Sequence, residues 1–183
     1  MNPVKLVVYV GSLREKSFNK MLARAMKENA PEGVEVTIGD FSQLPFYNGD
    51  LEAAFPAEAK RLKDEIRAAD GVAIVTPEYN RSVPGYLKNM IDWTSRPYGD
   101  SAWDNKPVIL LGASTGNIGT AVAQAHLRQM MVYLAARVVG QPEFYMGQAK
   151  SKFSDDGVLT DEETKKHLVE MMSKLAAEIR ARA

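Results

Sequence analysis

Short, continuous apolar runs recur along the chain and predict strands that are covered on both faces. The clearest occupy residues 6–10, 72–75 and 108–111, are rich in Val, Ile and Leu, and are flanked by Gly or Pro. Residues 34–38 alternate between apolar and polar side chains, which favours a strand nearer the edge of a sheet. Residues 137–139 begin a further short run. The pattern therefore predicts a sheet with a fifth strand starting near residue 137.

Between these runs, apolar residues recur with helical spacing. We predict helices over residues 18–28, 57–69, 84–93, 120–134 and 161–182. Pro84 stands at the first position of the third helix, where its missing N–H leaves no helical bond unmade. Thr160 and Glu163 have the spacing of a capping box before the last helix.

The alternation of strands and helices over the whole chain predicts an α/β fold with a parallel sheet. The length of 183 residues suits a single domain over residues 1–183. The best fit is a flavodoxin-like, doubly wound, five-stranded parallel sheet with helices on both faces. In such sheets ligands bind beyond the carboxyl ends of the strands, where the strand order changes direction. The loops after Val10, Val75 and Leu111 are therefore the candidate functional loops.

The composition argues against several classes of function. The 23 Lys and Arg residues balance the 23 Asp and Glu residues, so the chain lacks the net positive charge that drives non-specific binding to nucleic acid or anionic membranes. The chain has no Cys and only two His residues, which argues against disulfides, thiolate catalysis and a metal site. No apolar run is long enough to cross a membrane. We expect a cytoplasmic protein with no metal, no nucleic-acid partner and no membrane insertion.

The first candidate loop, residues 11–19 (GSLREKSFN), combines groups that bind phosphate. Ser12 and Ser17 supply hydroxyls, and a helix that begins near Ser17 adds free N–H groups and a favourable dipole. Arg14 adds a guanidinium and Asn19 an amide. The single glycine distinguishes this loop from Walker and dinucleotide-binding loops. The alternative, in which these residues only end a strand and cap a helix, stays open.

The second candidate loop, residues 76–89 (TPEYNRSVPGYLKN), is stiffened by a proline near each end, the first being Pro77. Fixed backbone angles would hold the peptide groups of Glu78, Tyr79 and Asn80 ready to bond a flat heterocycle. We assign no acid–base role to Glu78, because no second carboxylate or His lies near it in sequence. An ordinary turn with Tyr79 packed beneath it is the alternative.

The third candidate loop, residues 112–119 (GASTGNIG), consists of small residues that let a ligand approach the backbone. Ser114 adds a hydroxyl, and Gly116 leaves the main chain uncovered. The GxxxGxxG spacing does not match a dinucleotide-binding fingerprint. Alone, the loop is equally consistent with a glycine-rich turn before a helix.

Taken together, the three loops resemble those of the NADPH-dependent FMN reductase family, in particular its branch of flavodoxin-like quinone and chromate reductases. Residues 11–19 resemble the phosphate loop of that family, residues 76–97 its flavin-ring signature, and residues 112–134 its later flavin-edge loop and helix. Matched spacing continues through residues 141–144, so the resemblance covers nearly the whole chain apart from the C-terminal helix. Arg81 departs from the pattern, because several relatives carry an aromatic residue there.

The resemblance implies non-covalently bound FMN, with NADPH or NADH as cosubstrate and a small molecule as electron acceptor. The flavin would carry the chemistry, so no catalytic side chain is expected: hydride passes from the nicotinamide through FMN to a quinone, chromate, flavin or azo dye in a ping-pong scheme. Family members are commonly homodimers or homotetramers. The residues that the resemblance assigns to FMN are Ser12, Arg14, Ser17 and Asn19 at its phosphate, Pro77, Glu78, Tyr79 and Asn80 along its ring system, and Ser114 and Gly116 beside the flavin.

Two features bear on assembly. Residues 130–134 are apolar enough for a subunit face, although such a stripe more often belongs to the core. Arg128 and Glu143, at matched family positions, are candidates to pair across an interface.

Three rival functions fit the same topology. The main one is a flavodoxin-type electron carrier without nicotinamide-dependent activity. A phosphoacceptor regulatory domain needs acidic residues at the strand ends to hold Mg²⁺, but Val10 and Val75 are followed by Gly11 and Thr76. A third protein class would bind flavin only as a structural ligand and would not turn it over.

Overall fold

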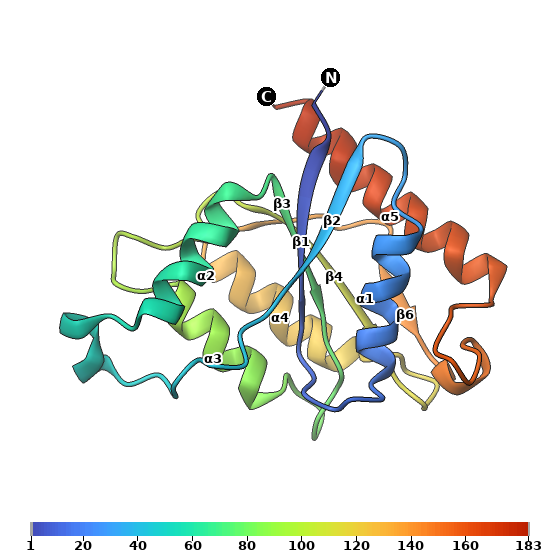
Figure 1. Cartoon of the computed structure of the whole chain (residues 1–183), viewed down its shortest axis with the longest axis horizontal. Helices are drawn as coiled ribbons and strands as arrows, with labels where there is room; N and C mark the ends of the chain where they lie inside the picture. Colours follow the sequence, from blue (N-terminus) through green and yellow to red (C-terminus); the bar gives the residue numbers. More distant parts are fainter. Residues whose placement is uncertain (1, 183) are drawn as a thin grey trace.

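The computed structural model describes residues 2–182 and confirms the parallel sheet with helices on both faces (Figure 1). The strand order is β2-β1-β3-β4-β5, with β6 also pairing with β4, and all the pairs are parallel. This order is that of the flavodoxin-like sheet. The strands are β1 (Val4–Val10), β2 (Val34–Gly39), β3 (Gly71–Val75), β4 (Pro107–Ala113), β5 (Arg137–Val138) and β6 (Phe144–Met146).

The predicted fifth strand is divided into two short pieces. β5 pairs with Pro107 and Val108 at the start of β4, whereas β6 pairs with residues 111–113 at its end. Both pieces therefore occupy the same edge of the sheet. Gly140 and Pro142 lie between them, and a proline cannot donate a ladder hydrogen bond, which is consistent with the interruption.

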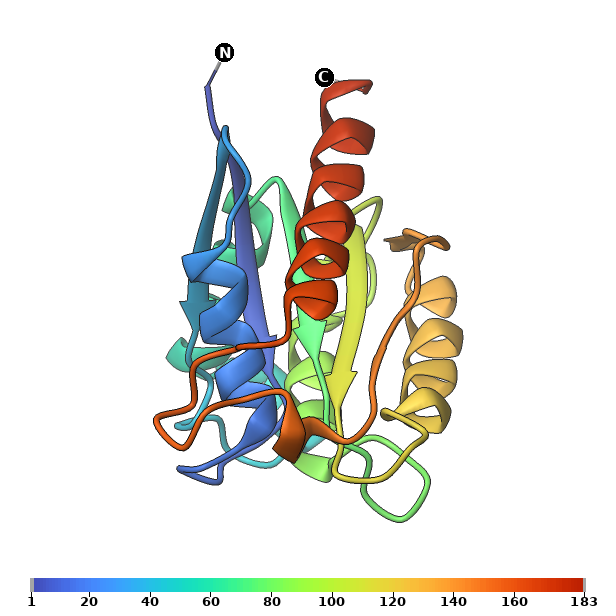
Figure 2. The same ribbon diagram turned by 90° about the vertical axis from the view of Figure 1, so that its right-hand side faces the viewer.

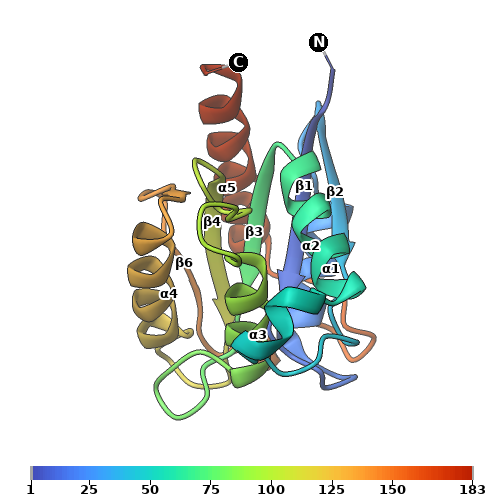
Figure 3. The same ribbon diagram turned by 90° about the vertical axis from the view of Figure 1, so that its left-hand side faces the viewer.

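The helices form two layers. Figure 2 faces the layer of α1 and α5, and Figure 3 faces the layer of α2, α3 and α4. Among residues 2–182, no helix is long and apolar enough to cross a membrane. The helical segments are α1 (Phe18–Glu28), α2 (Ala57–Ala68), α3 (Gly85–Thr94), α4 (Ala121–Tyr133) and α5 (Glu162–Arg180), with short 3₁₀ segments η1 (Gly49–Ala54) and η2 (Ala149–Ser151).

The central strands are buried on both faces, which explains their continuous apolar runs. In β1, Val8 and Val10 pack into the core under α1 and α5. Val7 and Tyr9 point the other way, into the core under α2, α3 and α4. A strand at this position has no solvent-facing side, so its sequence shows no alternation of polar and apolar residues.

Two helix starts differ from the prediction. Pro84 precedes α3 as its N-cap and is not its first helical residue. The predicted capping box of Thr160 and Glu163 is wrong, because α5 is capped by Asp161, whose Oδ1 accepts a hydrogen bond from the Thr164 N–H at 2.9 Å. The carboxylate, one residue further along, takes the place of the expected hydroxyl.

Candidate functional site

The three candidate loops lie side by side at the carboxyl edge of the sheet, at the end of the molecule opposite the two chain ends (Figures 1 and 2). Main-chain hydrogen bonds join the first residues of two of the loops to the neighbouring strands: the Gly11 N–H donates to Val75 O at 2.9 Å, and the Thr76 N–H donates to Leu111 O at 2.9 Å. The loops meet because parallel pairing of β1, β3 and β4 brings all three carboxyl ends to the same edge.

The first loop offers hydroxyl groups at the N-terminus of α1. Ser12 and Ser17 are both buried, and Ser17 caps the helix by accepting a hydrogen bond from the Asn19 N–H at 3.2 Å. The Ser12 hydroxyl makes no hydrogen bond with any other residue in the range 2–182. Arg14 is exposed beside them. Hydroxyls, a helix N-terminus and a guanidinium together suit a small anion.

Asn19 connects the first loop with the third. Its amide Nδ2 donates to Ala113 O, and its Oδ1 accepts from the Ala113 N–H, both at 2.9 Å. Asn19 is buried, so these bonds are shielded from water. The structure thus brings Asn19 to the predicted site and turns its amide toward the main chain of β4.

The second loop ends in a tight turn. Tyr79 and Ser82 exchange main-chain hydrogen bonds of 3.0 and 2.9 Å, and Asn80 and Arg81 between them have left-handed backbone angles, with φ of 50° and 61°. Two consecutive residues with positive φ are typical of a two-residue hairpin turn. Tyr79 is 45% exposed, so it is not fully packed beneath the turn.

The Glu78 carboxylate caps a helix from another part of the chain. Its Oε2 accepts hydrogen bonds from the N–H groups of Val122 and Ala123 at 3.0 and 3.1 Å, in the first turn of α4. Thr120, the N-cap residue of α4, makes no capping bond with its own side chain. Glu78 also pairs with Arg81 at 3.1 Å. Sequence reasoning missed this role because the partners are 44 and 45 residues away.

The third loop borders a hollow of about 350 Å³. Ser114 Oγ donates to Gly116 O at 3.2 Å, and the Gln148 N–H donates to the same oxygen at 2.9 Å. The Gly116 carbonyl is therefore held by one donor within the loop and one outside it. A side chain at Gly116 would meet nothing within 4 Å, so the main chain there faces open space. The hollow is lined by Glu78, Asn80, Arg81, Ser114, Gly116, Asn117, Ile118 and Thr120.

The structure therefore groups the predicted residues unevenly. Four of them line the 350 Å³ hollow: Glu78 and Asn80 from the second loop, and Ser114 and Gly116 from the third. Ser12 instead lines a second hollow of about 560 Å³, between α1 and the end of β2. The remaining predicted residues line neither hollow, although their loops adjoin both: they are Arg14, Ser17, Asn19, Pro77 and Tyr79.

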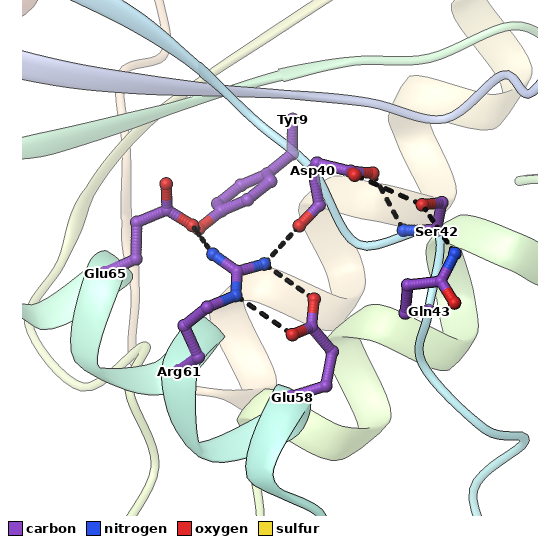
Figure 4. Close-up of polar contacts among 7 residues, drawn as sticks. All are labelled: Tyr9, Asp40, Ser42, Gln43, Glu58, Arg61 and Glu65. Atoms are coloured by element: carbon purple, nitrogen blue, oxygen red, sulfur yellow. Dashed lines mark hydrogen bonds and ion pairs between the residues drawn. The ribbon is translucent and has the colours of Figure 1, made fainter.

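A charged network lies beside the larger hollow and was not foreseen (Figure 4). Arg61 bonds Glu58 at 3.0 and 2.7 Å, Glu65 at 3.2 Å and the main-chain oxygen of Asp40. The Tyr9 hydroxyl donates a hydrogen bond to Glu65 Oε2 at 3.0 Å. Hydrogen bonds from Arg61 hold the pKa of Glu58 below its usual value, while burial and the adjacent Glu65 raise the pKa of Tyr9. The network fastens the end of β2 to α2.

The pair and the apolar stripe that the sequence suggested for a subunit interface both make contacts within one chain. Arg128 Nη2 lies 3.2 Å from Glu143 Oε1 within one chain, and the Tyr145 hydroxyl donates to the same oxygen at 2.7 Å. The apolar stripe near the end of α4 is divided, since Met131 is fully buried whereas Val132 and Tyr133 are 70% and 79% exposed. Part of the stripe is therefore core, and part is surface.

The chain is similar to known proteins over most of its length. Residues 4–151 match the family model of the NADPH-dependent FMN reductases. A 2-hydroxy-1,4-benzoquinone reductase of Burkholderia sp is 46% identical over 179 residues, 98% of each chain. A quinone reductase of Escherichia coli (strain K12) is 45% identical over 169 residues, covering 90% of this chain and 89% of that protein.

A solved structure extends the match to three dimensions. FerB, a flavoenzyme NAD(P)H:(acceptor) oxidoreductase from Paracoccus denitrificans, superposes with a TM-score of 0.89 at 39% identity, covering 97% of this chain and 98% of that one. The family model spans most of the chain, and the relatives match it almost end to end. The chain belongs to the NADPH-dependent FMN reductase family.

Proposed function

We propose that this chain oxidises NAD(P)H and reduces quinones, using FMN held by the three loops at the carboxyl edge of β1, β3 and β4. The observation that carries the proposal is the juxtaposition of an anion-binding helix N-terminus with a hollow bounded by exposed main chain. Ser12 and Ser17 lie at the helix N-terminus, and Gly116 lines the hollow. A mononucleotide with one phosphate and one flat ring system needs both.

The residues of the first loop fit the phosphate. Ser12 would donate its hydroxyl, which has no hydrogen-bond partner within the described range 2–182. Ser17 keeps a hydroxyl proton while it caps α1, and the first N–H groups of α1 have no helical acceptor. Arg14 would supply the countercharge from the exposed side. Asn19 contributes by holding the loop against Ala113.

The second and third loops fit the ring system. We assign the main chain of residues 77–80 and of Ser114 and Gly116 to the flavin edge, because hydrogen bonds already hold their turns in place beside the hollow. Tyr79, half exposed, would cover part of the ring. Groups held in advance lose little entropy when the ligand binds.

The protein contributes position and polarity in this reaction. When bound, FMN supplies the hydride chemistry that links the nicotinamide to the acceptor. Main-chain N–H groups of the third loop would stabilise negative charge that develops at the flavin edge, without reorganising during the reaction. Glu78 takes no part as an acid or base, because its carboxylate is bonded to the N-terminus of α4 and to Arg81.

The relatives' names favour quinones as acceptors. We extend the proposal to chromate, free flavins and azo dyes, which an open site would also admit, and to a cytoplasmic homodimer or homotetramer. The exposed Val132 and Tyr133 support a subunit contact near the end of α4.

A direct experiment separates this function from that of a one-electron carrier. The purified protein is loaded with FMN, freed of excess cofactor, and mixed with NADH or NADPH under anaerobic conditions. We expect the visible flavin band to bleach and to return when a quinone is added. A bound flavin that neither nucleotide reduces would favour the carrier, and failure to retain FMN would overturn the proposal.

A further inference from the structure

Arg81 lines the 350 Å³ hollow. It is the second of the two residues with positive φ in the turn closed by Tyr79 and Ser82. Positive φ at both central residues is what a two-residue hairpin turn requires, and it sets the backbone from which the Arg81 side chain extends. The turn places this arginine beside the hollow at the carboxyl edge of the sheet.

The turn is also anchored to α4 on both sides. Glu78, before it, bonds two N–H groups in the first turn of α4. Ser82, after it, lies 3.0 Å from Nδ1 of His126 on the same helix. Arg81 therefore projects from a turn whose two ends are held, which limits the volume that its guanidinium can sample.

The charge balance leaves Arg81 available to a ligand. Of the residues that line the hollow, only Arg81 is cationic and only Glu78 is anionic. Glu78 is 11% exposed, and its charge is met by the N-terminus of α4 as well as by Arg81. Arg81 is 67% exposed and uses a single N–H in the pair with Glu78, so its other donors have no partner among residues 2–182.

We propose that Arg81 selects electron acceptors that carry a negative charge beside a reducible carbonyl, the ionised 2-hydroxyquinones being the simplest class. The inference rests on the proposed function and defines its acceptor. In such a quinone the ionised oxygen and the neighbouring carbonyl oxygen lie next to each other, as the two oxygens of a carboxylate do. A planar guanidinium can donate to both at once, which an ammonium group cannot match.

The reaction itself is balanced without any further reagent. NAD(P)H gives up a hydride, which carries two electrons and one proton, and becomes NAD(P)⁺. The acceptor gains those two electrons, its two carbonyl groups become hydroxyl groups, and water supplies the remaining proton. Negative charge increases on the acceptor oxygens as electrons arrive, so the guanidinium stabilises the transition state more than the free substrate.

The test compares two acceptors of similar size, 2-hydroxy-1,4-benzoquinone in its ionised form and neutral 2-methyl-1,4-benzoquinone. For Arg81→Gln, we expect kcat/KM for the anionic acceptor to fall by about tenfold or more, the scale of a lost charge-assisted bidentate contact, with less than about a twofold change for the neutral one. Arg81→Lys restores part of the preference. Arg137→Gln, which removes an arginine at the opposite end of β4, is the matched control and leaves both acceptors unchanged.

Binding gives a readout independent of turnover. The oxidised FMN-loaded protein, without NAD(P)H, is titrated with the ionised hydroxyquinone and followed by calorimetry; we expect weaker binding to Arg81→Gln at an unchanged FMN content. Equal losses for both acceptors, or a raised KM for NAD(P)H with an unchanged acceptor ratio, would overturn the inference while leaving the proposed function intact. If the parent protein reduces neither quinone, the proposed function itself fails.

Discussion

The side-chain amide of Asn19 and the main chain of Ala113 form a pair of hydrogen bonds, each 2.9 Å long, across 94 residues of sequence. This pair joins the first turn of α1 to the end of β4. It therefore fixes the distance between the loop assigned to the FMN phosphate and the loop assigned to the ring. A small change in this distance would affect both ends of one ligand at the same time.

Replacement of Asn19 by Ala should weaken both folding and cofactor binding. The change leaves a buried N–H and a buried carbonyl of Ala113 without partners, which costs about 1–3 kcal/mol of unfolding free energy. Urea denaturation of the cofactor-free protein measures this loss, and fluorescence titration measures the FMN affinity. Gln129→Ala, at an exposed position of α4, is the control. Stability equal to that of the parent would show that the pair is dispensable.

Replacement of Glu78 by Ala should loosen the start of α4. We expect a loss of about 1–2 kcal/mol in unfolding free energy, as for other removed N-caps. Hydrogen exchange at the amides of Val122 and Ala123 should become faster, while Glu78→Gln, which keeps an acceptor oxygen, has a smaller effect. Intact protection of these amides together with an altered pH profile of kcat would instead assign Glu78 a role in proton transfer.

Replacement of Arg14 by Ala should reduce the retention of FMN. The guanidinium is exposed at the phosphate loop, so its loss should raise the Kd for FMN by about tenfold at low salt and by less at high salt. Riboflavin, which lacks the phosphate, serves as the control ligand and should bind both proteins alike. An FMN affinity that does not change with this substitution contradicts the assignment of the phosphate loop.

Asp161 should make folding sensitive to acid. Hydrogen bonds from Thr164 and from Lys152 lower the pKa of its carboxyl from 3.8 to about 2. Because the folded pKa is the lower one, the stabilisation is present above the unfolded value and is lost as the pH falls from about 4 toward 2. Denaturation curves measured across this interval give the unfolding free energy at each pH. The unfolding free energy of Asp161→Asn should change less steeply with pH than that of the parent. The same slope in both proteins would mean that other carboxylates dominate.

Local pattern was enough to locate most elements. The amphipathic period predicted α1 at both of its ends, and buried runs predicted β1, β3 and β4 within a few residues. The division between β5 and β6 was missed, because the three residues Phe144–Met146 are too few to show a period. The cap of α5 was misplaced by one residue, since Thr160 and Asp161 are both acceptable capping residues and only packing chooses between them.

The buried runs were sufficient to predict that three loops meet at one sheet edge, because buried parallel strands bring their carboxyl ends together whatever the loops contain. The contacts that the side chains of those loops make could be found only from the folded chain. Asn19 turns to Ala113 and Glu78 to the start of α4, over separations of 94 and 44 residues. Such contacts depend on how helices pack onto the sheet, and the packing brings together residues between which the local sequence carries no pattern.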